Sequence, residues 1–180
     1  MEWTITYIVS QILTIIKYSL LGATYYSKNR KKVLIFNFTS VIVTMVIFIL
    51  LKAWSGLATA GITFFANIIF LIEEKNNSKE KNSKNDVIIL ITIYTMFIIC
   101  SVITYEGLPS LFSILAGMVF IYSIWQKKTS IYKLLGIATS LLWMSYNIYI
   151  MSILGIIFES IIFICSITGY ILERTNKRKK

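Results

Sequence analysis

The chain contains seven long apolar runs, and these constrain its fold more than any other feature. Each run is close to the roughly 20 residues that a helix needs to cross the hydrocarbon core of a bilayer. Backbone polar groups in lipid must bond within their own segment, so continuous runs of this length predict helices and not barrel strands. The sequence therefore predicts an all-α polytopic membrane bundle, with helices at Thr4 to Tyr25, Val33 to Leu51, Gly56 to Ile72, Val87 to Tyr105, Leu108 to Trp125, Ile131 to Ile150 and Ser152 to Leu172.

Composition excludes several other classes of protein. Seven spans use most of the 180 residues, so residues 1–180 are predicted to form a single transmembrane domain. The net charge of +10 does not indicate nucleic-acid binding, because the basic residues stand in short runs between apolar stretches and not on one wettable face. There is no His, and Cys100 and Cys165 both lie within apolar runs. We therefore expect no metal site, no cofactor and no enzymatic activity.

The distribution of basic residues predicts the orientation in the membrane. Of the 18 Lys and Arg residues, sixteen fall on one side of the predicted bundle, in the first, third and fifth connections and in a basic tail at residues 173–180. The positive-inside rule places that side in the cytoplasm. The prediction is a multi-pass protein of the inner or plasma membrane with its N-terminus outside and its C-terminus inside. The tail is also expected to contact anionic lipids.

An internal repeat is suggested by two pairs of short motifs. Leu21-Gly22 matches Ala116-Gly117 at a spacing of 95 residues, and the segment from Gly61 to Phe64 matches that from Gly155 to Phe158 at 94. This predicts two parallel three-helix units, residues 4–72 and 108–172, joined by a linker helix at 87–105. Parallel repeats of this kind build SWEET-type carriers. The alternative is that any two apolar three-helix stretches align tolerably.

The second half of the chain resembles the YgjV-type bacterial inner membrane proteins. The residues that carry the resemblance are Leu108-Pro109, the segment Trp143-Met144-Ser145-Tyr146-Asn147, and Gly155 to Glu159. The family is similar to a broader group that includes SWEET, PnuC and PQ-loop proteins, which implies a SWEET-like architecture. The Pro-Gln pair of that group is absent, since the only proline, Pro109, is followed by Ser110.

Glu159 is the strongest candidate for a functional residue, because it is the only acidic residue within an apolar run. A charged group inside the bilayer costs at least about 2.5 to 3.5 kcal/mol on insertion scales, so it should face protein or water. Trp143 and Asn147 are four residues apart and share a helix face. The repeat adds Asn67 and Ser160 to this predicted substrate pathway. The alternative is that these polar side chains only bond neighbouring helices.

Lys17 is the only basic residue within the first apolar run. We predict an intramembrane ion pair between Lys17 and Glu159, since two opposite charges in lipid cost less together than apart. The alternative is that the long stem of Lys17 lets its ammonium reach the cytoplasmic interface.

Together these features predict a small-molecule transporter or facilitator that binds a small polar substrate. The alternative is a non-transporting membrane protein such as a receptor, a sensor or an accessory subunit. Two units in one chain make a monomer sufficient, although a homo-oligomer remains compatible with the sequence. The transporter hypothesis requires a cavity that reaches Glu159, whereas the alternative predicts a closed core.

Overall fold

The computed structural model describes residues 5–51, 54–76, 84–103, 105, 107–149, 151 and 153–178. Within these residues the chain is built of helices and short connections, which confirms the predicted all-α bundle. The seven helices are α1 (Ile5–Tyr26), α2 (Arg30–Leu50), α3 (Trp54–Asn76), α4 (Lys84–Ile103), α5 (Leu108–Trp125), α6 (Thr129–Tyr149) and α7 (Ile153–Arg178). Residues 77–83 of the predicted third connection and Lys179-Lys180 of the predicted tail lie outside the described residues.

The predicted spans agree with these helices to within a few residues except at the end of α7. The predicted span ends at Leu172, whereas α7 continues through Arg178 and so includes most of the predicted tail. Glu173, in this additional part of α7, pairs with Lys133 of α6 at 2.9 Å. A span predicted from hydropathy stops at the first charged residue and cannot anticipate such a partner.

Local signals set several of the helix ends. The side chain of Asn29 caps α2 by accepting a hydrogen bond from the backbone N–H of Lys31. Gly107 precedes α5 at a φ of 107°, which glycine adopts without steric cost. Met151 lies in the turn between α6 and α7 with a φ of 54°. Such short connections make consecutive helices antiparallel neighbours.

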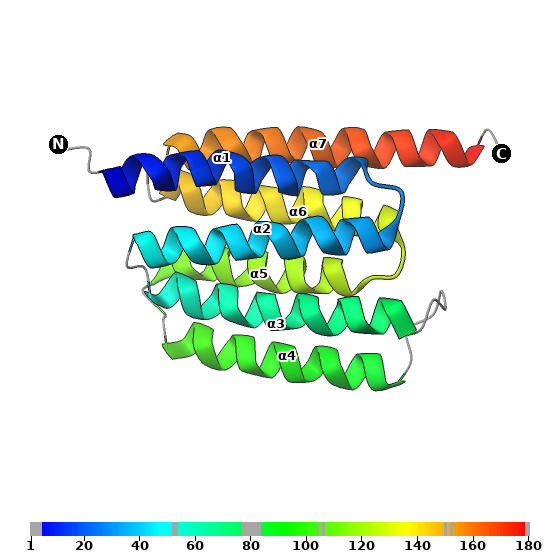
Figure 1. Cartoon of the computed structure of the whole chain (residues 1–180), viewed down its shortest axis with the longest axis horizontal. Helices are drawn as coiled ribbons and strands as arrows, with labels where there is room; N and C mark the ends of the chain where they lie inside the picture. Colours follow the sequence, from blue (N-terminus) through cyan, green and yellow to red (C-terminus); the bar gives the residue numbers. More distant parts are fainter. Residues whose placement is uncertain are drawn as a thin grey trace.

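The helices lie side by side with their long axes roughly parallel, and the two termini emerge at opposite ends of the bundle (Figure 1). Six of them pack in a closed order, α1 against α2, α2 against α3, α3 against α5, α5 against α6, α6 against α7, and α7 against α1. The remaining helix, α4, packs against α3 and α5. We call the end where α1 ends and α2 begins the basic end, and the opposite end the far end.

The outer surface of the bundle matches a lipid environment. Four stretches within the described residues are long and apolar enough to cross a membrane, namely α1, α2, Asp86–Ile103 in α4 and Ile153–Asn176 in α7. Large apolar side chains such as Ile12, Ile91 and Ile164 are more than half exposed. Lipid chains would cover such a surface, whereas water would disfavour it.

Small residues let α1 approach its neighbours closely. A Cβ added to Gly169 of α7 would collide with the backbone oxygen of Tyr25, and one added to Gly136 of α6 would collide with the Tyr25 ring. Both positions therefore require glycine while Tyr25 keeps its place. Close approach through small residues is the usual way that helices pack in membranes.

Helix ends recur at a spacing of 99 residues. Tyr26 and Trp125 end α1 and α5, α2 and α6 begin at Arg30 and Thr129, and the starts of α3 and α7 follow at the same spacing. The sequence motifs instead suggested a spacing of 94 or 95 residues, which differs from the spacing of these helix ends by about one helical turn. The glycines of these motifs have different surroundings: Gly22 faces Cys165, Gly117 faces Phe97, and Gly61 has nothing within 4 Å.

Candidate functional site

A cavity of about 520 Å³ lies inside the bundle and is lined by residues from all seven described helices. Its volume falls in the range of small-molecule sites, roughly 300 to 1,000 Å³. Much of its wall is polar but uncharged, with side chains that include Asn37, Ser40, Thr44, Thr63, Ser113 and Asn147. Hydroxyl and amide groups of this kind can donate and accept hydrogen bonds to a polar ligand.

The cavity occupies the middle of the bundle and the half toward the far end. Its lining includes Phe48 and Thr59, which lie near the end of α2 and the start of α3, and Ser110 and Asn147, which lie near the start of α5 and the end of α6. Toward the basic end the lining stops at Tyr25, Asn37 and Phe120. The cavity is therefore placed asymmetrically along the bundle axis.

Three of the five predicted pathway residues line the cavity together. Trp143, Asn147 and Glu159 all contribute to its wall, and Glu159 is only 6% exposed to the outside. The amide nitrogen of Asn147 donates to the backbone oxygen of Trp143 at 2.8 Å. The hydroxyl of Tyr18 donates to Oε1 of Glu159 at 3.0 Å, and the ring of Tyr18 stacks on Phe158. Tyr18 thus fixes the position of the Glu159 carboxylate.

The other two predicted pathway residues, Asn67 and Ser160, are not among those that line the cavity. Asn67 is fully buried and donates its amide to the backbone oxygen of Thr63 at 2.9 Å. Ser160 donates to the backbone oxygen of Ile156 at 2.7 Å. At the spacing of 99 residues, Asn67 aligns with the buried Ser166 and not with Ser160.

Lys17 and Glu159 both reach the cavity and interact electrostatically, but their charged atoms are not within ion-pair distance of each other. Among the described residues no carboxylate lies within ion-pair distance of the Lys17 ammonium. The ammonium instead lies over the ring of Tyr18, 4.6 Å from its centroid, in a cation–π contact. Because Tyr18 also contacts Glu159, the two charges flank one tyrosine. Lys17 is thus held at the cavity and does not extend to the basic end.

The spacing of 99 residues relates the two sides of the cavity wall. Within the described chain, eight pairs of lining residues are separated by this spacing: Tyr18 and Gly117, Leu21 and Phe120, Ser40 and Thr139, Val41 and Ser140, Thr44 and Trp143, Phe48 and Asn147, Ala60 and Glu159, and Thr63 and Ile162. All eight pairs consist of two different residue types, so sequence identity could not reveal them. The sequence analysis did not select Tyr18, because tyrosine is uncharged and only its neighbour Lys17 carried an unusual charge.

The basic end of the cavity is closed by a layer of aromatic and hydroxyl groups. The rings of Tyr25 and Tyr132 stack with their centroids 5.3 Å apart. The Tyr132 hydroxyl lies 2.7 Å from Oγ1 of Thr24 and accepts a hydrogen bond from the Asn37 amide at 3.2 Å. These contacts join α1, α2 and α6 across the bundle. They separate the cavity from the ends of the helices on this side.

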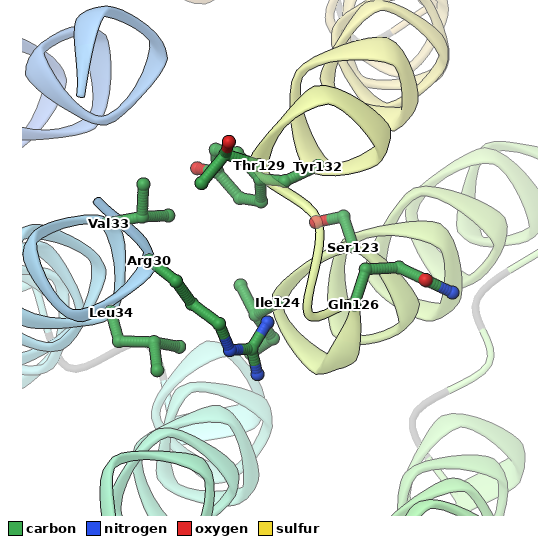
Figure 2. Close-up of a pocket in the computed structure, with 8 residues that line it drawn as sticks. All are labelled: Arg30, Val33, Leu34, Ser123, Ile124, Gln126, Thr129 and Tyr132. Carbon is green, nitrogen blue, oxygen red and sulfur yellow. The ribbon is translucent and has the colours of Figure 1, made fainter. Parts of the chain in front are cut away.

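On the side of this layer toward the basic end lies a second, much smaller space of about 10 Å³, which is room for about one water molecule. Figure 2 shows Arg30 crossing it from α2 toward α5, with Tyr132 and Thr129 of α6 on another side. The guanidinium donates to the backbone oxygen of Trp125 at 3.2 Å and to Oε2 of Glu74 at 2.9 Å. Arg30 therefore ties α2 to α3 and α5.

Further ion pairs join the remaining helices at the basic end. Lys127 lies 2.9 Å from Glu73 and 3.7 Å from Asp86, which links the end of α5 to α3 and α4. Lys133 of α6 pairs with Glu173 of α7 at 2.9 Å. Glu73 lies beyond the predicted span of its helix, and its pKa is raised by burial and by a hydrogen bond with Asp86, against the lowering effect of Lys127. Ion pairs and hydrogen bonds of charged side chains thus involve every helix from α2 to α7 at the basic end.

The comparison with known proteins identifies the family. Residues 8–177 match Imp-YgjV, described as a bacterial inner membrane protein. The chain belongs to this family. The match covers nearly the whole bundle and confirms the resemblance seen in the sequence. It agrees with the apolar outer surface and places the protein among bacterial inner membrane proteins. Searches of curated proteins and of solved structures gave no match.

Proposed function

We propose that this YgjV-family protein is a transporter or facilitator for a small polar molecule, which binds in the central cavity. The observation that carries the proposal is a cavity of about 520 Å³ with the Glu159 carboxylate in its wall. An ionisable residue within a membrane bundle marks a substrate or ion pathway more often than a structural contact. A closed core, which a purely structural role for Glu159 would require, is not what surrounds it.

The arrangement of helices supports a carrier built from two three-helix units and a linker helix. The order of packing is unchanged when α1, α2 and α3 are exchanged for α5, α6 and α7, and the lining residues pair at one spacing. In this proposal α4 is the linker outside the ring. Carriers with parallel repeats bind substrate between the repeats near the bilayer midplane and expose it by rocking one repeat against the other.

The orientation proposed from the basic residues gives the cavity a direction. With the basic end in the cytoplasm, the tyrosine layer and the ion pairs close the cytoplasmic side, and the cavity extends toward the outer side. Release into the cell would then require Tyr25 and Tyr132 to separate and the ion pairs between α2, α3 and α5 to break. The sequence carries no ATP-binding motif, so transport would be passive or driven by an ion gradient.

Cysteine labelling from the two faces of the membrane tests this proposal. In a background with Cys100 and Cys165 replaced by alanine, Ser113→Cys places a thiol in the cavity wall. A transporter exposes it in turn to both sides, so a membrane-impermeant thiol reagent should react in right-side-out and in inverted vesicles. Thr95→Cys, on the outer face of α4, is the matched control and should remain unreactive, since lipid covers it. Labelling from one face only would contradict the proposal.

A receptor or sensor is the second candidate. The cavity at Glu159 differs from the closed core expected for a non-transporting protein, but the ion pairs of the basic end favour a protein that does not open on that side. The four ion pairs that the described residues form all lie in this layer and oppose the opening that transport needs. Such a protein would bind a ligand from the outer side and signal without passing it on. The same labelling experiment separates the two functions, because a receptor predicts reaction from the outer face alone. Uptake by proteoliposomes that is lost in Glu159→Gln would favour the transporter.

A further inference from the structure

We propose that the ligand of the central cavity is a small zwitterion, with one cationic and one anionic group close together as in a free amino acid. This inference rests on the proposed function, because it names the substrate class for the same cavity. It starts from two charges in the wall, Lys17 and Glu159. The two charges interact with each other through space, but neither has a partner of opposite charge within ion-pair distance among the described residues.

The Lys17 ammonium has three N–H donors. Among the described residues it has no carboxylate partner within ion-pair distance, and it lies over the face of the Tyr18 ring at 4.6 Å. A cation–π contact attracts the charge but does not supply hydrogen-bond acceptors in the way that oxygen atoms do. In a cavity such acceptors come from water or from a ligand. A carboxylate is the ligand group that both accepts these bonds and neutralises the charge.

Glu159 presents the opposite requirement at the same tyrosine. Its carboxylate can accept about four hydrogen bonds, and the Tyr18 hydroxyl supplies one of them at 3.0 Å. No lysine or arginine of the described residues pairs with it. An ammonium group brought by a ligand would donate up to three hydrogen bonds and offset the negative charge. Lys17 and Glu159 together therefore complement one positive and one negative group.

The position of these charges within the repeat strengthens the argument. At the spacing of 99 residues the counterpart of Lys17 is Ala116, and the counterpart of Glu159 is Ala60. Each charge thus occurs in one half of the bundle only, and the other residues that line the cavity are uncharged. A symmetric or uncharged ligand gives no reason for this difference. A ligand with its own separated charges does, because each end meets a different half of the bundle.

The rest of the wall sets the size and character of the remainder of the ligand. Leu21, Ile114 and Ile162 add apolar surface to the wall, and the cavity of about 520 Å³ leaves room for a side chain of medium size. A ligand with a single charge would displace water from the other wall charge without offering it a partner, which costs affinity. The same penalty disfavours a neutral sugar or nucleoside. Selectivity for zwitterions follows from both penalties together.

A ligand series that varies only charge tests this inference. The standard amino acids are screened by their effect on the melting temperature of the purified full-length protein. The most stabilising one is then compared with its N-acetyl derivative, which keeps only the carboxylate, with its methyl ester, which keeps only the amine, and with its N-acetyl amide, which keeps neither. We expect a rise in Tm with the free amino acid and a much smaller rise with each derivative.

Variants of the two charges locate the binding site. Lys17→Met and Glu159→Gln should each weaken binding of the free amino acid by about tenfold or more, which corresponds to about 1.4 kcal/mol. Lys17→Arg keeps the charge and should retain binding. Thr95→Val, on the outer face of α4 and away from the cavity, is the matched control and should bind as the unmodified protein does. If a variant fails to fold, the ligand series on the unmodified protein still decides.

Two results would overturn the inference. The first is an equal rise in Tm with the N-acetyl amide, or with neutral sugars and nucleosides in the same assay. The second is no rise with any amino acid. Either result leaves the transporter proposal standing, because that proposal depends on labelling from both membrane faces. Conversely, zwitterion binding with labelling from one face would support this inference and reject transport.

Discussion

The two halves of the bundle treat buried charge in opposite ways. At the basic end the buried charged side chains are paired, as in Arg30 with Glu74 and Lys133 with Glu173. In the cavity Lys17 and Glu159 remain apart, and both contact the same tyrosine. Pairing accompanies closure at one end, and its absence accompanies a large cavity at the other. In this bundle, charged side chains that pair with each other close one end. Lys17 and Glu159, which have no close partner of opposite charge among the described residues, line the cavity.

The first prediction removes one charge from a sealed pair and carries the largest expected effect. Glu173→Gln leaves the Lys133 ammonium, whose side chain is 2% exposed, without its partner at 2.9 Å. Breaking a buried pair in this way costs about 3 to 5 kcal/mol. Thermal unfolding in detergent should show a large fall in Tm.

The control is the double variant that also carries Lys133→Met. It removes both charges together, so it should recover most of the lost stability. A fall in Tm that is equal for the single and the double variant would mean that the pair does not seal this end.

The second prediction introduces a larger side chain at the closed end, where it would push α1 and α7 apart. Gly169→Val places a side chain against the backbone oxygen of Tyr25, which cannot move without shifting α1. Overpacking of this kind costs about 1 to 3 kcal/mol. Gly61→Ala is the matched control, because nothing lies within 4 Å of its added Cβ. Equal Tm values for the two variants would contradict the close approach of α1 and α7.

The third prediction compares one hydroxyl in each half. Tyr132→Phe removes the group that joins Thr24 and Asn37 in the sealed layer, and leaves both with fewer partners. The expected loss is about 0.5 to 1.5 kcal/mol for each hydrogen bond. Tyr18→Phe removes the hydroxyl that donates a hydrogen bond to Glu159. Water in the cavity can replace this donor, so the Tm of the variant should change little. A larger fall in Tm for Tyr18→Phe than for Tyr132→Phe would contradict the distinction between the closed end and the water-accessible cavity.

The fourth prediction concerns pH and carries the smallest effect. The folded-state pKa of Glu73 is raised above its usual value by burial and by Asp86. The folded protein therefore binds this proton more tightly than the unfolded chain, and stability is lost as pH rises from the usual glutamate pKa through the raised one. Glu73→Gln cannot titrate, so the Tm difference between variant and parent should grow with pH in that window. A constant difference would show that Glu73 does not contribute.

The sequence predicted the helices well because hydropathy depends on single residues and their neighbours. Leu108 and Trp125 bound α5 as expected, and Glu159 was expected at a cavity because a lone carboxylate in an apolar run is too costly to face lipid. Which side chains share a wall is a different matter, since it depends on how helices distant in the chain rotate against each other. Asn67 was assigned to a pseudo-twofold cavity with Asn147 and Glu159, but it is not among the residues that line the cavity.

The ion pairs of the basic end could not be predicted from the sequence either. Glu73, Glu74 and Glu173 stand near lysines and arginines in segments that are simply polar and positively charged overall. Such segments indicate orientation but name no partners. Only the convergence of six helix ends at one layer turns these residues into specific pairs. The tyrosines Tyr25 and Tyr132 were similarly hidden, because an aromatic residue near a span end usually anchors the helix at the interface.

The separation of Lys17 and Glu159 between the two halves of the chain bears on how such a protein could arise. A dimer of the first half alone would hold two ammonium groups around its central space, and a dimer of the second half would hold two carboxylates. Neither assembly would be dipolar. If the two halves descend from one three-helix unit, each could acquire its own sign only after both had joined in a single polypeptide, and fusion would have preceded the present polarity of the chamber.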